Sequence, residues 1–363
     1  MAQTKGQIAS KQPQKATISD LAKAEERTAW WLLAPSLIIL AVIAIYPLGQ
    51  VFISSFTNAR FAAGDTGAPT QFVGFANYRN LLSLTIRAIP FEVDSETGER
   101  NYTNARLFLR SEVGRGYDRV REFSFLGTRY VFGATNARFI NSIIDTIVFT
   151  VVAVSLATLF GMIIALALTN KFFGRSTMRT AMLVPWAIIT VVSALIWEWM
   201  FKSDRTGFFN SLLTQTGLAD RSIGFLTEPA LQLPSIIAVD VWKTTPFMAL
   251  LLLAGLSTIP KELYEAAEVD GASRLRRFFS VTLPLLSPTL AVALIFRTLD
   301  SLRVFDLFQV VFGERRYSMA SFAQDTLISN RDVGLSSASS VVIFIIIFAF
   351  ALFYIRILGV DSE

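Results

Sequence analysis

The chain has 363 residues, of which 53% are hydrophobic and 17% charged, with a net charge of +5 and 31 phenylalanines. Soluble domains carry about a quarter charged residues, so this composition predicts a polytopic membrane protein. The chain contains no cysteine and no histidine, which excludes disulfides, thiolate metal sites and Ser-His-Asp triads. The small positive charge is explained by loop lysines and arginines, so we expect no nucleic-acid partner. Because cysteine and histidine are absent, we also expect no metal site and no catalytic residue.

The N-terminal residues predict a polar tail and a first membrane helix. Residues 1–28 are polar and basic, and we expect them to form a cytoplasmic tail. The run at 29–53 is uncharged, is longer than the hydrophobic region of a signal peptide, and ends without a small-residue cleavage pattern. We therefore expect it to be retained as the first transmembrane helix.

The long connection at 54–140 is rich in arginine, glycine and aromatic residues. Its second half, 87–138, is strongly polar and contains alternating patches such as R-E-F-S-F at 121–125, which are typical of a strand. Connections of this length are usually functional or disordered. We expect either a small extracytoplasmic cap with some strand or a disordered extracytoplasmic loop.

Six segments are suited to cross about 30 Å of hydrocarbon at about 20 residues each. They are Trp30–Ile53, Thr146–Leu168, Ala181–Phe201, Leu233–Leu256, Leu285–Phe305 and Ala338–Ile355. The third, fourth and fifth contain charged residues, so these three assignments require buried charge. We predict an all-α polytopic fold with six transmembrane helices, five of them in a core at 141–358 that is followed by a C-terminal tail at 359–363.

Loop charges indicate the orientation, because cytoplasmic loops carry an excess of lysine and arginine. With the N-terminus inside, the connections 169–180 and 257–284 are also inside. The first carries three cations and no acid, and the second carries four cations. The outside connections 202–232 and 306–337 are also partly basic, but the rule favours this orientation. Both termini are expected in the cytoplasm.

The connection 257–284 predicts two short helices joined by a turn. Good helix formers precede Gly271, which stands where a left-handed residue ends a helix, and Ser273 can cap the next helix. Leu283-Pro284 would stop that helix and open the fifth span. Two alanines and an acidic side chain suit docking, because they allow a close approach and an ion pair across an interface. The alternative is an ordinary capped helix-turn-helix connection.

The order of residues in this connection is E-A-A at 265–267, three residues, Gly271, nine residues, Val281, one residue and L-P. This order resembles the cytoplasmic EAA loop with which permease subunits of ABC importers dock onto their ATPase. A chain with this loop would conduct a solute without hydrolysing ATP itself.

The whole chain is similar to the sugar-importer permeases of the maltose and trehalose type, and most similar to the first permease of the trehalose importers. The similarity covers 30–85 and 140–355. The segments 241–248 and 296–306 have the sequence pattern of this subfamily. The segment 87–138 departs from the pattern as an insertion, so the resemblance implies no role for it.

The resemblance implies a complex with a second permease subunit, an ATPase dimer and an extracytoplasmic sugar-binding protein in the cytoplasmic membrane of a bacterium or an archaeon. ATP and Mg²⁺ would be bound by the ATPase, and this chain would bind no cofactor; it contains no G-x-x-x-x-G-K-[ST] phosphate loop. In the family the EAA glutamate contacts the ATPase and the glycine shapes the loop. The implied docking residues are Glu265, Ala266, Ala267, Asp270, Gly271, Leu283 and Pro284.

Charged residues at membrane depth are costly and usually face a cavity or a partner. Arginine and aspartate alternate at every third position from 297 to 306, so neighbours can pair along one side of a helix, and an aspartate and a lysine repeat the spacing in the fourth span. These groups either line the path and bind sugar hydroxyls, or pair with one another or the second permease and hold the bundle. The path candidates are Asp240, Trp242, Lys243, Arg297, Asp300 and Arg303.

Aromatic rings offer a further contact, because sugars stack their C–H faces on them. Trp242 is the preferred ring because charged path candidates flank it. Trp186, Trp197 and Trp199 are also candidates. For the last two an interfacial belt is the favoured interpretation, since they stand near the external end of their span.

These observations favour a permease subunit of an ABC importer for a disaccharide such as trehalose or maltose. A different sugar, a polyol or a glycerol phosphate is an alternative substrate. A secondary transporter would need inverted repeats or a coupling-ion site, and the sequence shows neither. A membrane enzyme is disfavoured by the lack of histidine and cysteine, although carboxylate chemistry stays open to it.

Overall fold

The computed structural model describes residues 20–61, 69–93, 100–112 and 116–357. The chain divides into two compact units, Met1–Val51 and Phe52–Glu363. The predicted tails at 1–28 and 359–363 lie outside the described residues, except that 20–28 belong to the first helix.

The first unit is one long apolar helix. It consists of α1 (Asp20–Leu40), a π-helical turn (Ala41–Ile45) and α2 (Tyr46–Ser54), whose end belongs to the second unit. The stretch Glu25–Ser54 is long and apolar enough to cross a membrane, and none of its most apolar window is buried within the chain. An apolar surface of this size needs lipid or a partner to cover it. The predicted first span therefore agrees with the structure.

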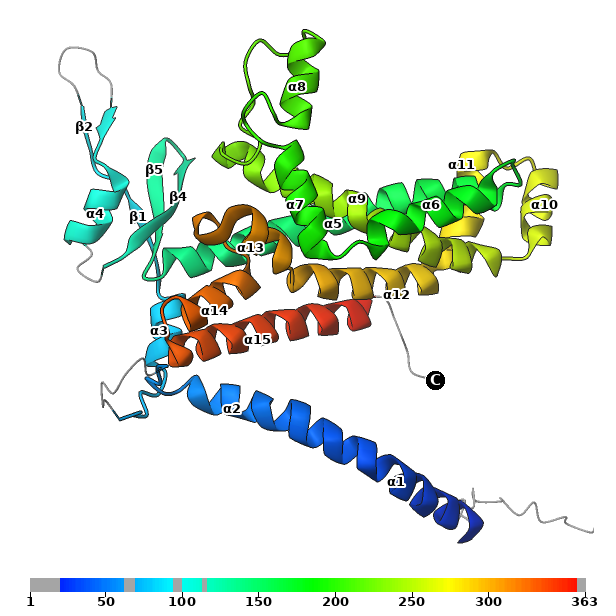
Figure 1. Cartoon of the computed structure of the whole chain (residues 1–363), viewed down its shortest axis with the longest axis horizontal. Coiled ribbons are helices and arrows are strands. Elements are labelled where there is room, and N and C mark those ends of the chain that lie inside the picture. The colour runs from blue at the N-terminus through cyan, green and yellow to red at the C-terminus, as the bar shows by residue number, and fades with distance from the viewer. Residues whose placement is uncertain (1–19, 62–68, 94–99, 113–115, 358–363) are drawn as a thin grey trace, which may run out of the picture. The chain divides into compact units, whose positions relative to one another are not determined.

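Four further predicted spans are single helices of the second unit. They are α5 (Ala137–Thr169), α9 (Pro229–Ser257), α12 (Leu283–Leu302) and α15 (Val333–Ile357), which lie side by side in Figure 1. α5 and α9 pack most extensively, and α12 packs on α5, α9 and α15. A Cβ added to Gly161 of α5 would lie 2.9 Å from the Cβ of Met248, so the missing side chain permits this close approach.

The third predicted span, Ala181–Phe201, is wrong as a single straight helix. The chain forms α6 (Arg175–Ala187) and α7 (Thr190–Met200), which are bent by 91° at the break. The two isoleucines between them are extended, with ψ angles of 133° and 136°. Pro185 interrupts the helical ladder just before β-branched residues of weak helix propensity. The described residues therefore hold five membrane-length helices, or six if the bent pair is one span.

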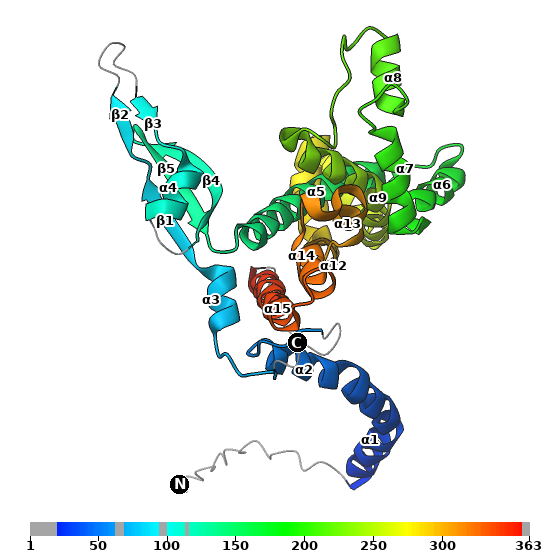
Figure 2. The same cartoon turned by 60° about the vertical axis from the view of Figure 1, so that its left-hand side comes forward.

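Part of the long connection folds into a small cap that contains strands, which is the folded one of the two expected alternatives and the exception to an otherwise helical chain (Figure 2). α4 (Ala105–Glu112) packs on its sheet through Leu109, which is fully buried together with Val131. The antiparallel sheet has the order β1 (Leu84–Ala88), β5 (Thr128–Ala134), β4 (Asp118–Phe125), and a separate hairpin pairs β2 (Phe91–Val93) with β3 (Arg100–Tyr102). The chain runs from β5 almost directly into α5.

Short helices complete the second unit. They are α3 (Ala76–Leu82), α8 (Phe208–Gln215), α13 (Asp306–Phe312), a 3-10 turn (Gly313–Arg315) and α14 (Met319–Ile328). Arg316 donates two hydrogen bonds of 2.7 Å to Asp145, which fastens the segment after α13 to α5. Burial, together with the hydrogen bond that it donates to Asp325, raises the pKa of Tyr317 to about 12, so this hydroxyl stays protonated at physiological pH.

Candidate functional site

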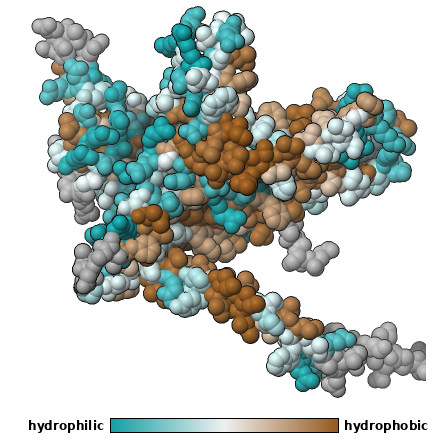
Figure 3. Space-filling view, in the orientation of Figure 1, coloured by the Kyte–Doolittle hydropathy of each residue, from teal (hydrophilic) through white to brown (hydrophobic). Residues whose placement is uncertain are grey.

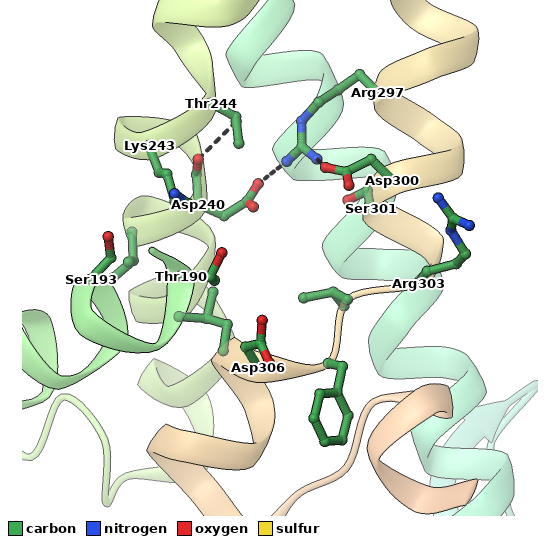
Figure 4. Close-up of a pocket in the computed structure, with 14 residues that line it drawn as sticks. Thr190, Ser193, Asp240, Lys243, Thr244, Arg297, Asp300, Ser301, Arg303 and Asp306 are labelled. Atoms are coloured by element: carbon green, nitrogen blue, oxygen red, sulfur yellow. Dashed lines mark hydrogen bonds and ion pairs between the residues drawn. The ribbon is translucent and has the colours of Figure 1, made fainter. Parts of the chain in front are cut away.

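A charged pocket lies among α7, α9, α12 and α13 (Figure 4). Its volume is about 170 Å³. Five of the six predicted path residues line it, and Trp242 does not. The polar lining consists of Thr190, Ser193, Asp240, Lys243, Thr244, Arg297, Asp300, Ser301, Arg303 and Asp306.

A buried arginine joins two helices across this pocket. Arg297 of α12 pairs with Asp240 of α9 and donates a 3.0 Å hydrogen bond to Asp300 on its own helix. The Arg297 side chain is 2% exposed, whereas that of Asp300 is 71% exposed. The predicted ladder ends here, because α12 ends at Leu302 and Arg303 is directed away from the pair (Figure 4). Among the described residues no ion pair reaches Arg303.

Lys243 holds the break between α6 and α7. Its ammonium donates hydrogen bonds to the carbonyl oxygens of Trp186 and Ile188, at the end of α6. A cation is favourable there, because the last carbonyls of a helix lack partners and carry partial negative charge. The ring of Trp186 also stacks on Phe247 of α9, with centroids 5.6 Å apart. The end of α6 is therefore fastened to α9 at two points, and the path candidate Lys243 has this structural role as well.

Three buried polar atoms of the pocket lack hydrogen-bond partners among the described residues. They are Oγ of Ser193, Oγ of Ser301 and Nε of Arg297. Buried polar groups are nearly always hydrogen-bonded, so such a cluster indicates a place for water or a polar ligand. Sequence reasoning missed both serines. Their only signal is a hydroxyl within an apolar span, which is weak because helical hydroxyls usually bond to their own backbone.

Trp242 belongs to a different cluster. Trp242 is 38% exposed, and its ring lies edge-on to Trp197, with centroids 5.4 Å apart. Trp197 in turn stacks on Phe209 and lies against Phe201. These rings pack α7 on α9 and on α8, away from the charged pocket.

The polar connection after α9 forms the predicted pair of helices. α10 (Lys261–Val269) ends in a turn in which Gly271 has a φ of +75° and the N–H of Ala272 donates to Ala267 over 2.9 Å. This is a Schellman ending, which only glycine adopts without strain. The predicted cap is also present, since the Ser273 side chain accepts from the N–H of Arg276 at the start of α11 (Arg274–Arg277).

Leu283-Pro284 does not end the second helix, which corrects the prediction. α11 continues through a π-helical turn (Phe278–Thr282) into α12 as one helical stretch. Pro284 is the second residue of α12 and follows directly on the π-helical turn, where the hydrogen-bond ladder changes register.

The surface of this connection combines charge with exposed apolar side chains. Glu265 and Ala266 are exposed, and no ion pair reaches Glu265 among the described residues. In Figure 3 hydrophilic colour marks α10 and the cap, whereas hydrophobic colour covers α7. Exposed apolar side chains in a polar segment often mark an interaction surface. Here they are Leu263, Val269, Leu275 and Phe279.

Long apolar helices, a charged pocket between them and a polar helical connection define a multi-pass membrane protein with the organisation of a transport component. A profile of the family described as "Binding-protein-dependent transport system inner membrane component" matches residues 129–360. The chain belongs to this family.

Several characterised relatives are similar over much of the chain. The trehalose/maltose transport system permease protein MalF of Thermococcus litoralis is 42% identical over 66% of this chain and 81% of that protein. The trehalose transport system permease protein SugA of Mycobacterium tuberculosis is 31% identical over 93% of this chain and 90% of that protein. A solved bacterial ABC transporter of the acidic polysaccharide alginate matches 95% of this chain and 100% of its own, with a TM-score of 0.67 and 19% identity, which shows a shared fold.

Proposed function

We propose that this chain is a permease subunit of an ATP-driven ABC importer for sugars and that it carries a disaccharide such as trehalose or maltose. The relatives named for trehalose and maltose support this substrate. Other relatives are named for sulfoquinovosyl glycerol, at 31% identity, and for sn-glycerol-3-phosphate, at 29% identity. These two ligands define the alternative substrates.

The charge balance of the pocket is the observation that carries the proposal. Its lining holds three carboxylates and three cations. A phosphate or sulfonate site would be expected to carry excess positive charge and arginines free for bidentate contact. Here the buried Arg297 is already paired with Asp240, Arg303 is directed away from that pair, and the orphan groups include two serine hydroxyls. This lining suits an uncharged, hydroxyl-rich solute such as a sugar.

The size of the pocket supports a second permease subunit as a partner. Small-molecule sites usually measure about 300–1,000 Å³, whereas this pocket measures about 170 Å³. One chain therefore supplies part of the path, and a second permease supplies the rest. In this proposal Asp240, Lys243, Arg297, Asp300 and Ser301 face the sugar from one side, while the Asp240–Arg297 pair also holds α9 to α12.

The polar connection 257–284 is proposed to dock on an ATPase dimer, which binds ATP and Mg²⁺. Glu265 is exposed and without an ion pair among the described residues, so a cation of the ATPase can reach it. Ala266, Ala267 and Gly271 have small side chains or none, so another surface can come close to Glu265, and Asp270 adds a further exposed carboxylate. The exposed Val269 and its apolar neighbours would be covered by the ATPase.

The two ends of the helix bundle are proposed to lie on opposite sides of the cytoplasmic membrane of a bacterium or an archaeon. Figure 1 shows the cap and α10 at opposite ends of α5, α9 and α12. With α10 at the ATPase in the cytoplasm, the cap lies outside, where an extracytoplasmic sugar-binding protein delivers the solute. Both termini are likewise proposed to lie in the cytoplasm.

The test is uptake of labelled trehalose and labelled maltose by the native host with and without this gene. The intact gene should restore uptake of at least one sugar, Glu265→Ala should not, and Glu262→Ala one turn earlier on α10 should. Equal restoration by all three would refute the docking assignment. If deletion of the gene abolishes uptake of sn-glycerol-3-phosphate only, the proposed disaccharide substrate is refuted. Uptake by the purified chain without any partner would favour a secondary transporter.

A further inference from the structure

A single hydrogen bond ties the inner side of α10 to the beginning of α12. The hydroxyl of Tyr264 lies 3.1 Å from Oγ1 of Thr282, and either atom can donate. Thr282 is 3% exposed. Tyr264 is half-buried against an apolar cluster that includes Leu256 of α9 and Leu286 of α12. This contact lies on the side of α10 opposite the solvent, immediately before Glu265 in the chain.

Thr282 occupies a distinctive place in the backbone. It is the last residue of the π-helical turn, in which the N–H of Leu283 donates to the carbonyl of Phe278, five residues back. A π turn inserted into an α-helix is uncommon and is frequent at functional sites. The hydroxyl of Thr282 also lies 3.5 Å from the carbonyl oxygen of Arg277. Tyr264 therefore contacts α12 where its hydrogen-bond ladder changes register.

Among the described residues, one other polar contact between side chains joins α10 to this helical stretch. Glu268 forms an ion pair of 2.9 Å with Arg277, but the glutamate side chain is 71% exposed. Exposed ion pairs contribute little and are screened by salt. The hydroxyl pair joins the buried Thr282 to the half-buried Tyr264, so it is less exposed than the ion pair and is the better candidate to keep α10 and α12 in one geometry.

We propose that the Tyr264–Thr282 bond is the positioning link that carries a displacement of α10 into the charged pocket. α12 is one helix from Leu283 to Leu302, so movement of its first turn is carried about 22 Å to Arg297. The inference rests on the proposed docking of the ATPase on α10. Neither hydroxyl contacts the sugar or the ATPase in this proposal. Loss of the bond should therefore uncouple ATP hydrolysis from sugar transport while the ATPase stays bound to this chain.

The test uses the complete importer, purified from the native host through a tag on this chain and reconstituted in liposomes. Labelled trehalose is the probe, or maltose if only that sugar is taken up. Tyr264→Phe and Thr282→Val should each lower the ratio of sugar transported to ATP hydrolysed at least threefold, and the double variant should lower it no further. Thr282→Ser retains the hydroxyl and should restore the ratio.

A matched control exists within the same helix. Tyr354 of α15 forms an equivalent hydroxyl bond of 3.0 Å with Thr298 of α12, away from α10. Tyr354→Phe should leave the ratio unchanged. An unchanged ratio in Tyr264→Phe, additive losses in the double variant, or loss of the co-purified ATPase from Tyr264→Phe would each overturn the link. Failure of the docking proposal can be told apart from failure of the link. If the docking proposal is wrong, the Glu265→Ala variant should still co-purify with the ATPase and still transport the sugar.

Discussion

Replacement of Asp240 by leucine should destabilise this protein more than replacement of any other pocket carboxylate. The Arg297 side chain is 2% exposed and would keep only Asp300 as a counter-ion. Breaking a buried ion pair by removing one partner costs about 3–5 kcal/mol, because a charge remains buried and uncompensated. Asp300 is 71% exposed, so Asp300→Leu should cost about 0–1 kcal/mol.

The assay is thermal unfolding of the importer in lipid nanodiscs. Asp240→Leu should lower the unfolding midpoint well below that of Asp300→Leu, although each change removes one carboxylate. The double variant Asp240→Leu with Arg297→Leu should recover most of the loss, because no buried charge is then left unpaired. Equal midpoints for the two single variants, or an additive loss in the double variant, would show that water compensates Arg297 and would refute this reasoning.

Two other predictions concern helix geometry. Lys243→Met should loosen the bend between α6 and α7. The Ser193→Cys substitution introduces a single thiol into this cysteine-free chain, and that thiol should react faster with a maleimide in the Lys243→Met background than in the presence of Lys243. An unchanged labelling rate would contradict the role of this lysine. Gly161→Leu should separate α5 from α9 and cost about 1–3 kcal/mol in thermal unfolding. Gly49→Leu, which meets no atom within 4 Å, is its control, and equal losses would show that the close approach is not limiting.

Local rules were sufficient for much of the fold. Uncharged apolar runs predicted α1–α2, α5 and α15, because the thickness of the hydrocarbon requires such lengths. The glycine and the serine of the polar connection predicted its turn and its cap, because both features depend on residues within one helical turn. The alternation in the cap indicated strand without deciding between a folded cap and a disordered loop. That choice depended on α4 and its burial of Leu109 against the sheet.

The sequence by itself determined which residues are charged at membrane depth, and only the tertiary structure decided what each of them contacts. Arg297 pairs with Asp240, 57 positions away, and Lys243 reaches the carbonyl of Ile188, 55 positions away. Spacing along one helix suggested a ladder of neighbours, but the ladder ends where α12 ends. Partners across a bundle depend on the rotation and depth at which helices pack, and these are decided by side-chain packing over the whole helix face. The same packing leaves the hydroxyls of Ser193 and Ser301 without partners.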